Sequence, residues 1–161
     1  MAPALHDEIA HLSFLLGEWH GTGEGESPTI EPFAYNEQVE FRHVGKPFVS
    51  YVQRTKHAAT GQPLHAESGY LRPVGVDRIE LLVVQPSGIV EMHDGSVDVG
   101  AQAIELTATH VLTTPTAKAV SAVQRNITVT GDSLSYTVNM GAVGQPLQHH
   151  LAATLQRMAG S

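Results

Sequence analysis

Short segments in which polar and apolar residues alternate run through most of the chain, and they constrain its fold more than any other feature. Residues 37–44 (EQVEFRHV) and 48–55 (FVSYVQRT) flank the turn GKP, and residues 64–73 and 78–85 flank VGVD. Further segments of this kind are residues 88–93, 103–112, 122–130 and 133–140. Such a series predicts an all-β sandwich or an antiparallel closed barrel. No helical pattern separates the segments, which excludes a parallel α/β fold.

The segment EWHGTGEGE is an unusual strand because glycine recurs at every second position. Trp19, Gly21, Gly23 and Gly25 share one face of this strand, so that face carries almost no side chains. A bare face permits sharp coiling or the close approach of another backbone, and both help to close a barrel. A flexible glycine loop is the alternative, but the single Trp in register with the glycines disfavours it.

The segment HDEIAHLSFLLG, which precedes the glycine-rich strand, is the one segment that reads as a helix. Ile9, Leu12 and Leu16 recur at helical spacing. Asp7 is the expected N-cap, and Gly17 is expected to end the helix. A short helix before the first strand suits a barrel that is plugged at one end.

Composition excludes several classes of protein. The chain of 161 residues has no cysteine, which removes disulfide scaffolds, zinc fingers, iron–sulfur clusters and thiol nucleophiles. A net charge of −7 argues against a general nucleic-acid or acidic-membrane surface. The apolar run LSFLLG is too short to span a membrane and lacks the basic flank of a signal peptide. We therefore expect one domain over residues 1–161, soluble and cytoplasmic, with no nucleic-acid or membrane partner.

No phosphate-binding loop or nucleophile elbow is present, and no sequence pattern places two carboxylates together. Histidine, in contrast, is abundant, with ten copies. His149 and His150 are adjacent, so in a strand one enters the barrel while the other faces outward. A single imidazole in an apolar cavity suits haem better than zinc, because zinc needs three or four protein ligands. The same segment also fits a helical stripe of apolar residues, made of Leu147, Leu151, Leu155 and Met158.

With these features the sequence resembles the nitrobindins, haem proteins with a fatty-acid-binding-protein-like barrel. The segment GEWHGTGEG matches their G-x-W-x-G-x-G signature through Gly17, Trp19, Gly21 and Gly23. Further matches lie between about residue 12 and residue 157 and comprise SPTI, HVGKPF, LHAESGYLR, QPSGIVE, LSYTVNM and GQPLQHHLAA. The bacterial, stand-alone form of the family is the most similar kind.

The resemblance implies a ten-stranded antiparallel barrel with a short N-terminal helix that holds one ferric haem b per chain. It implies that His150, just before LAA, is both the metal ligand and the catalytic residue, and that His149 faces outward. The other haem-binding positions that it implies are Thr29, Leu64, His65, Gln85, Arg125 and Met140.

Particular roles follow for some of these positions. Arg125 is expected to pair with a haem propionate, which suits a guanidinium. Leu64 and Met140 are expected to pack against the macrocycle, within an open and apolar cavity. His65 is not expected to bind iron.

The activity that the resemblance implies is binding of nitric oxide and isomerisation of peroxynitrite to nitrate. Two alternatives stay open: a haem-based nitric-oxide sensor or carrier, and a non-catalytic carrier of a fatty acid or another apolar ligand. The expected partners are therefore small molecules, and a homodimer is common for such barrels.

Overall fold

The computed structural model describes all 161 residues as one short helix followed by ten strands. The helix, η1, spans Asp7–Leu15. The strands are β1 (Gly17–Ser27), β2 (Ile30–Arg42), β3 (Val49–His57), β4 (Pro63–Val74), β5 (Arg78–Gln85), β6 (Ile89–Asp98), β7 (Ala103–Thr113), β8 (Val120–Thr130), β9 (Ser133–Ala142) and β10 (Gln148–Arg157). The segment with the two adjacent histidines is therefore a strand, not a helix.

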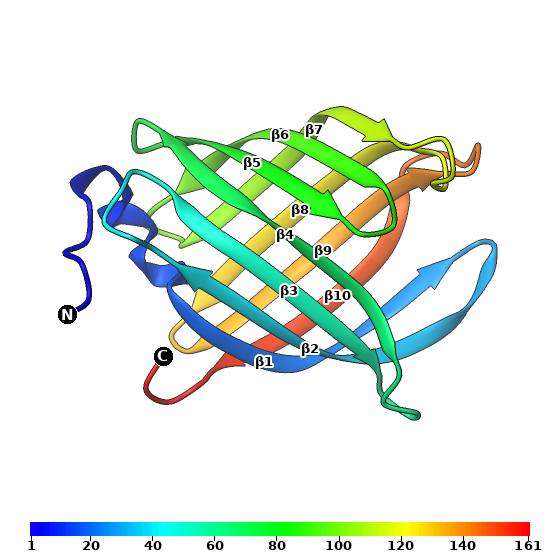
Figure 1. The fold of residues 1–161 in the computed structure, drawn as a ribbon, viewed down its shortest axis with the longest axis horizontal. Coiled ribbons are helices and arrows are strands. Elements are labelled where there is room, and N and C mark those ends of the chain that lie inside the picture. Colours follow the sequence, from blue (N-terminus) through cyan, green and yellow to red (C-terminus); the bar gives the residue numbers. More distant parts are fainter.

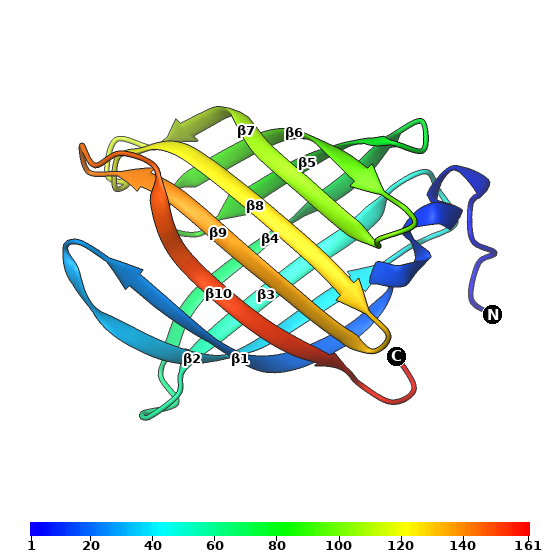
Figure 2. The same cartoon turned by 180° about the vertical axis from the view of Figure 1, so that it is seen from behind.

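The strands form one closed antiparallel barrel. Each strand pairs with its neighbours along the chain, and β1 also pairs with β10. Residues 19–25 of β1 oppose residues 151–157 of β10. Figures 1 and 2 show η1 and both termini at one end of the barrel and the β1–β2 turn at the other. The predicted all-β class, with a closed barrel of ten strands and a short N-terminal helix, is confirmed.

The helix η1 is a 3₁₀-helix, whose three residues per turn bring every third side chain onto one face. Ile9 and Leu15, six residues apart, are fully buried, so that η1 plugs its end of the barrel. The prediction of Asp7 as the N-cap was wrong. His6 occupies the cap, where its Nδ1 accepts a hydrogen bond of 3.2 Å from the N–H of Glu8.

Trp19 joins this plug to the barrel wall. Its indole Nε1 donates to the carbonyl oxygen of Leu15 at 2.8 Å, and the side chain is fully buried. The guanidinium of Arg157 lies 4.2 Å from the centre of the Trp19 ring and also donates to the carbonyl oxygens of Phe14 and Leu16. The first strand, the last strand and the helix are thus tied together at the closed end.

The glycine face of β1 is crowded, as its sequence pattern predicts. A Cβ atom at Gly21 would collide with the carbonyl oxygen of Thr154 on β10, and one at Gly23 would collide with the ring of Tyr35. Gly17 is required for another reason, because its φ of +130° is one that other residues rarely adopt. The glycines therefore let β10 approach β1 and leave room for Tyr35 inside the barrel.

The larger apolar cluster, of 20 buried residues, includes the helix and Trp19, whereas a second cluster of four centres on Ile89, Val120, Val123 and Val138. The nine-residue helix is the only one, and it lacks the length and hydrophobicity needed to cross a membrane. The main core thus includes the plugged end, and the opposite end is left for a cavity.

Candidate functional site

A cavity of about 530 Å³ lies inside the barrel. Its wall includes the core residues Leu71 and Leu134, and also Ile30 and Lys118 next to turns at the end opposite the helix. Hydrophobic residues make up 15 of the 25 lining residues, so the wall is mainly but not wholly apolar. A volume of this size is typical of small-molecule and cofactor sites.

Six of the seven predicted haem-binding residues line this cavity, namely Leu64, His65, Gln85, Arg125, Met140 and His150. Thr29 does not line it. Thr29 is exposed in the β1–β2 turn, where its Oγ1 lies 3.2 Å from Ser27 Oγ, and it lines a smaller cavity of about 250 Å³. His65, Gln85, Met140 and His150 line both cavities, so the two adjoin. The fold therefore gathers the seven predicted positions around two adjoining cavities.

A β-bulge directs His150 toward the cavity. In β10, His149 lies opposite Asn139 and Leu151 lies opposite Val138, so His150 is an extra residue in the ladder. Strict alternation from the inward-facing Leu151 would have turned His149 inward and His150 outward. The bulge reverses that order: His150 lines both cavities, and His149 is exposed at the rim of the smaller one.

The imidazole of His150 is fixed by the backbone of the first strand. Its Nδ1 lies 2.9 Å from the carbonyl oxygen of Glu26. Because a carbonyl oxygen only accepts, Nδ1 carries the hydrogen, and Nε2 is left unprotonated with no hydrogen bond from the protein. Burial lowers the pKa of His150, which keeps the ring neutral. A neutral imidazole that donates through Nδ1 and keeps Nε2 free is the form that binds metals.

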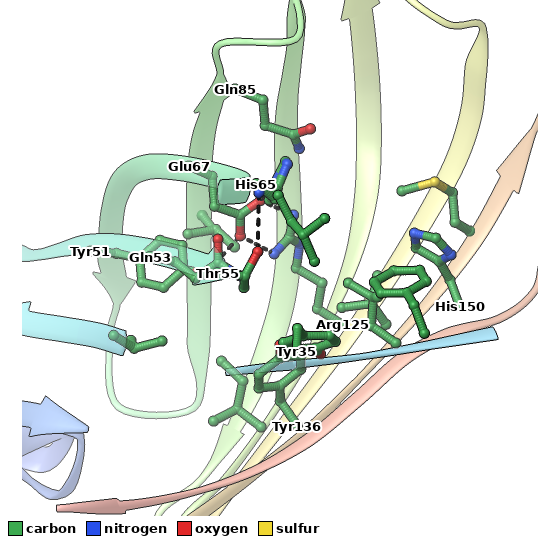
Figure 3. Close-up of a pocket in the computed structure, with 18 of the residues that line it drawn as sticks. Tyr35, Tyr51, Gln53, Thr55, His65, Glu67, Gln85, Arg125, Tyr136 and His150 are labelled. Carbon is green, nitrogen blue, oxygen red and sulfur yellow. Dashed lines mark hydrogen bonds and ion pairs between the residues drawn. The ribbon is translucent and has the colours of Figure 1, made fainter. Parts of the chain in front are cut away.

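Three charged side chains from distant strands meet beside the cavity, and two of them, Glu67 and Arg125, line it (Figure 3). Arg125 on β8 binds Glu67 on β4, with Nη1 2.6 Å from Oε1 and Nη2 3.2 Å from Oε2. Arg125 Nη2 also lies 3.0 Å from Oε1 of Glu91 on β6. The guanidinium is thus satisfied by two carboxylates, which does not favour the expected pairing with a propionate. The expectation that no two carboxylates come together was wrong. Barrel closure brings Glu91 and Glu67 to the same guanidinium, although they precede Arg125 by 34 and 58 residues in the chain.

Each of these carboxylates also has a histidine two residues away on its own strand. His65 Nε2 lies 3.1 Å from Glu67 Oε2, and His93 Nε2 lies 2.7 Å from Glu91 Oε1. Burial alone would raise the pKa of both glutamates, but the Arg125 guanidinium and the hydrogen bonds from the neighbouring histidines together outweigh it and hold both pKa values below their usual range. The wall therefore carries ionised groups, and the expectation of an apolar cavity was wrong in this respect.

A second polar group runs along β2, β3 and β9. The hydroxyl oxygens of Tyr35 and Tyr136 are 2.8 Å apart, and Tyr136 donates to Glu37 Oε2 at 3.0 Å. Gln53 Nε2 donates to the same oxygen at 2.6 Å. Tyr35, Gln53 and Tyr136 line the cavity, whereas Glu37 does not. Burial raises the pKa of Glu37 to about 7.

These polar residues were missed in the sequence, although a signal exists for one of them. In the segment EQVEFRHV, Glu37 shares a strand face with Val39 and Phe41, both buried. A carboxylate on an otherwise apolar face indicates a buried acid that needs a partner. Its partners Gln53 and Tyr136 lie 16 and 99 residues further along the chain, and no local pattern connects them.

The chain matches known proteins over almost its whole length. The family of THAP4-like, heme-binding β-barrel domains matches residues 8–157. A "Peroxynitrite isomerase 2" of Mycobacterium avium (strain 104) is 54% identical over 98% of this chain and 99% of its own length. A "Peroxynitrite isomerase" of Nocardia farcinica (strain IFM 10152) is 47% identical over 96% of this chain and 93% of its own.

The fold has a close counterpart among solved structures. The crystal structure of Rv2717c from M. tuberculosis superposes with a TM-score of 0.91 at 48% sequence identity, covering 96% of this chain and 99% of the other. The sequence and structure comparisons thus both find proteins that match this chain over almost its whole length.

Proposed function

Because this chain belongs to the family of THAP4-like, heme-binding β-barrel domains, we propose that it is a haem-dependent peroxynitrite isomerase that forms nitrate. The family match confirms the resemblance to nitrobindins that the sequence carries. The observation that supports the activity most directly is the geometry of His150. A neutral imidazole with a free Nε2 faces a cavity of cofactor size, and a backbone carbonyl fixes its other nitrogen.

The residues around the cavity fit a haem with His150 as its single protein ligand. Leu64 and Met140 supply apolar surface for the macrocycle. Lys118 is exposed beside the open end, lines both cavities and forms no ion pair, whereas Arg125 is held by Glu67 and Glu91. We assign Lys118, rather than Arg125, as the cation that pairs with a haem propionate.

When bound, ferric haem supplies an iron that takes small anionic or diatomic ligands, including nitric oxide. Isomerisation of peroxynitrite breaks an O–O bond and forms an N–O bond within one molecule, so it needs no external proton or electron. The chain's own residues hold the His150 imidazole neutral and in one orientation. The apolar part of the cavity wall limits the access of water to the ligand.

The test compares peroxynitrite decay with the hemin-loaded protein, the hemin-free protein and hemin-loaded His65→Leu. Hemin should accelerate the decay and make nitrate the main product. His65→Leu should retain most of this activity, because the reaction needs no proton donor. Decay that is no faster with hemin than without it would defeat the catalytic proposal and favour a nitric-oxide sensor or carrier. Failure to bind hemin at all would favour a carrier of apolar ligands.

We further propose that two copies of the chain associate through the outer face of strands β4 to β7. Two cross-strand rows on this face contain no charged residue. One row comprises Ser68, Val84, Val90 and Leu112, and the other comprises Tyr70, Leu82, Met92 and His110. Leu112 is 62% exposed, Val84 56% and Tyr70 50%, whereas the solvent face of an antiparallel sheet is normally polar.

A second copy suits this face because its border is neutral. The exposed ion pairs Arg72–Glu80 and Arg78–Asp94 lie in the adjoining rows and contribute two positive and two negative charges. Two chains that each carry a net charge of −7 can therefore meet here without like-charge contact. Sedimentation analysis should detect a dimer that Val84→Lys converts to a monomer, while Val76→Lys, in the exposed β4–β5 turn, leaves it intact. A native monomer, or a dimer that resists Val84→Lys, would contradict this interface.

A further inference from the structure

The hydrogen-bonded chain of Tyr35, Tyr136 and Glu37 has no part in the proposed function, although two of its members line the cavity. It begins at the Tyr35 hydroxyl, passes to the Tyr136 hydroxyl at 2.8 Å and ends at Glu37 Oε2 at 3.0 Å. Figure 3 shows both tyrosines in the cavity wall. Gly23 leaves the space that the Tyr35 ring occupies, so the family's glycine signature is itself part of this arrangement.

The direction of each hydrogen bond in the chain depends on the proton of Glu37. An ionised carboxylate only accepts, so Tyr136 donates to Glu37 and Tyr35 must donate to Tyr136. Tyr35 then has only an acceptor oxygen to offer the cavity. A protonated Glu37 can donate to Tyr136, which turns to donate to Tyr35. The hydrogen of Tyr35 is then free to donate to a ligand, and no hydroxyl in the chain loses its proton.

The surroundings of Glu37 make both states accessible near neutral pH. Glu37 is 5% exposed, and its Oε1 has no hydrogen-bond partner. On the two adjacent strands, Gly21 of β1 and Thr55 of β3 lie opposite Glu37. The neutral Gln53, also on β3, donates a hydrogen bond to the Glu37 carboxyl group. No cation forms an ion pair with Glu37, and burial raises its pKa to about 7.

The charged and titratable groups that act on Glu37 come from several other elements. Tyr136 lies on β9, and the ionised Glu67 and the neighbouring His65 lie on β4. Glu67 raises the pKa of Glu37 and His65 lowers it, but neither binds Glu37 directly. Arg125 on β8 is occupied by Glu67 and Glu91.

We propose that Tyr35 is a hydrogen-bonding group for the occupant of the cavity, and that Glu37, through Tyr136, sets whether Tyr35 donates or accepts. Tyr35 is thus a binding residue, and Glu37 and Tyr136 are positioning residues. The donating state favours an anionic oxygen or nitrogen, and the accepting state disfavours one. That the natural ligand is such an anion rests on the proposed function.

The first experiment uses hemin-free protein and so does not depend on the proposed function. Tyrosine labelled with carbon-13 at Cζ reports the hydrogen bond of each hydroxyl, and phenylalanine variants assign the four tyrosines. Between about pH 5 and pH 9, a range that spans the pKa of Glu37, the Tyr35 and Tyr136 signals should shift with one shared midpoint. The signal of Tyr70, which is half exposed on the outer face, should stay constant.

Variants identify the group that causes the shift. Glu37→Gln should abolish the pH-dependent shift of Tyr35, and Tyr136→Phe should uncouple Tyr35 from Glu37 while keeping the ring in place. His65→Asn should leave the shift present, which separates Glu37 from the nearby histidine. A Tyr35 signal that stays flat in the native protein, or that still shifts in Glu37→Gln, would overturn the proposal. A thermal melt of each variant verifies that it is folded.

The second experiment tests contact with a ligand, using azide and the hemin-loaded protein. Azide affinity should fall between pH 6 and pH 8 by a factor about five times larger in the native protein than in Tyr35→Phe. A change in affinity of about fivefold corresponds to the loss of one typical hydrogen bond. The comparison of the two proteins removes the pH dependence that belongs to azide and hemin. Identical pH profiles for the native protein and Tyr35→Phe would overturn the role of Tyr35 as a ligand contact.

Discussion

At the scale of single residues, the site depends on which polar atoms the barrel leaves without a partner. His150 gives its Nδ1 hydrogen to the Glu26 carbonyl and keeps Nε2 free. Arg125, in contrast, has no free binding group, because Glu67 and Glu91 pair with its guanidinium. Two residues that the sequence assigns to the same haem therefore differ in what they can still bind. The resemblance to a known family indicated both residues, but only their three-dimensional partners separate their roles.

Glu37 should make the stability of the fold depend on pH. Its pKa in the folded protein, about 7, lies above the ordinary value of 4.5, so the folded chain holds this proton more tightly than the unfolded chain. Protonated Glu37 therefore adds to the free energy of unfolding at low pH, and this contribution is lost as the pH rises through 7. At about 1.4 kcal/mol per pKa unit, the loss is roughly 3 kcal/mol.

The variant Glu37→Gln cannot ionise, so it should lose less stability than the native protein between pH 5 and pH 8. Urea unfolding at the two pH values measures this difference. Glu67 and Glu91 have lowered pKa values and act at more acidic pH, and they are present in both proteins. An equal change in the free energy of unfolding for both proteins would show that Glu37 is ionised throughout.

At the scale of elements, β1 and β10 show what a strand pattern can and cannot reveal. Alternating glycines predicted the crowded face of β1, because the position of glycine is visible in the sequence and its consequence is steric. The bulge in β10 was not predictable, because it depends on how residues 149 and 151 pair with β9. Only the resemblance to a known family, and not strand alternation, indicated His150 instead of His149.

Gly21→Val should destabilise the protein by several times the ~1 kcal/mol of a typical substitution. The added side chain would collide with the carbonyl oxygen of Thr154 and lie 2.7 Å from Leu155 Cα, so β10 would have to move. Thr22→Val is the matched control, because Thr22 is the neighbouring residue and is exposed on the outer face. Thermal melts compare the two variants, and similar melting temperatures would argue against a crowded closure between β1 and β10.

At the scale of the whole molecule, one end of the barrel is closed by packing and the other end leads to the cavity. The plugged end joins η1, Trp19 and Arg157, and the other end carries His150 and Lys118 beside the cavity. Alternation and turn residues were sufficient to predict an all-β sandwich or barrel, because these signals are local, and the resemblance to a known family indicated the ten-stranded barrel. The cluster of Arg125, Glu67 and Glu91 was not predictable, because its members come from three strands that only the closed barrel brings together.

A hemin titration of the native protein, His150→Ala and His149→Ala, followed by visible absorption, tests whether His150 holds the haem. Removal of an iron ligand should cost at least as much affinity as removal of one of its supporting groups, so His150→Ala should weaken hemin binding by about 100-fold or more. His149 is exposed and separated from the larger cavity, so His149→Ala should retain nearly native affinity and the native spectrum. Equal losses in the two variants, or a loss in His149→Ala alone, would contradict the assignment of His150 as the haem ligand.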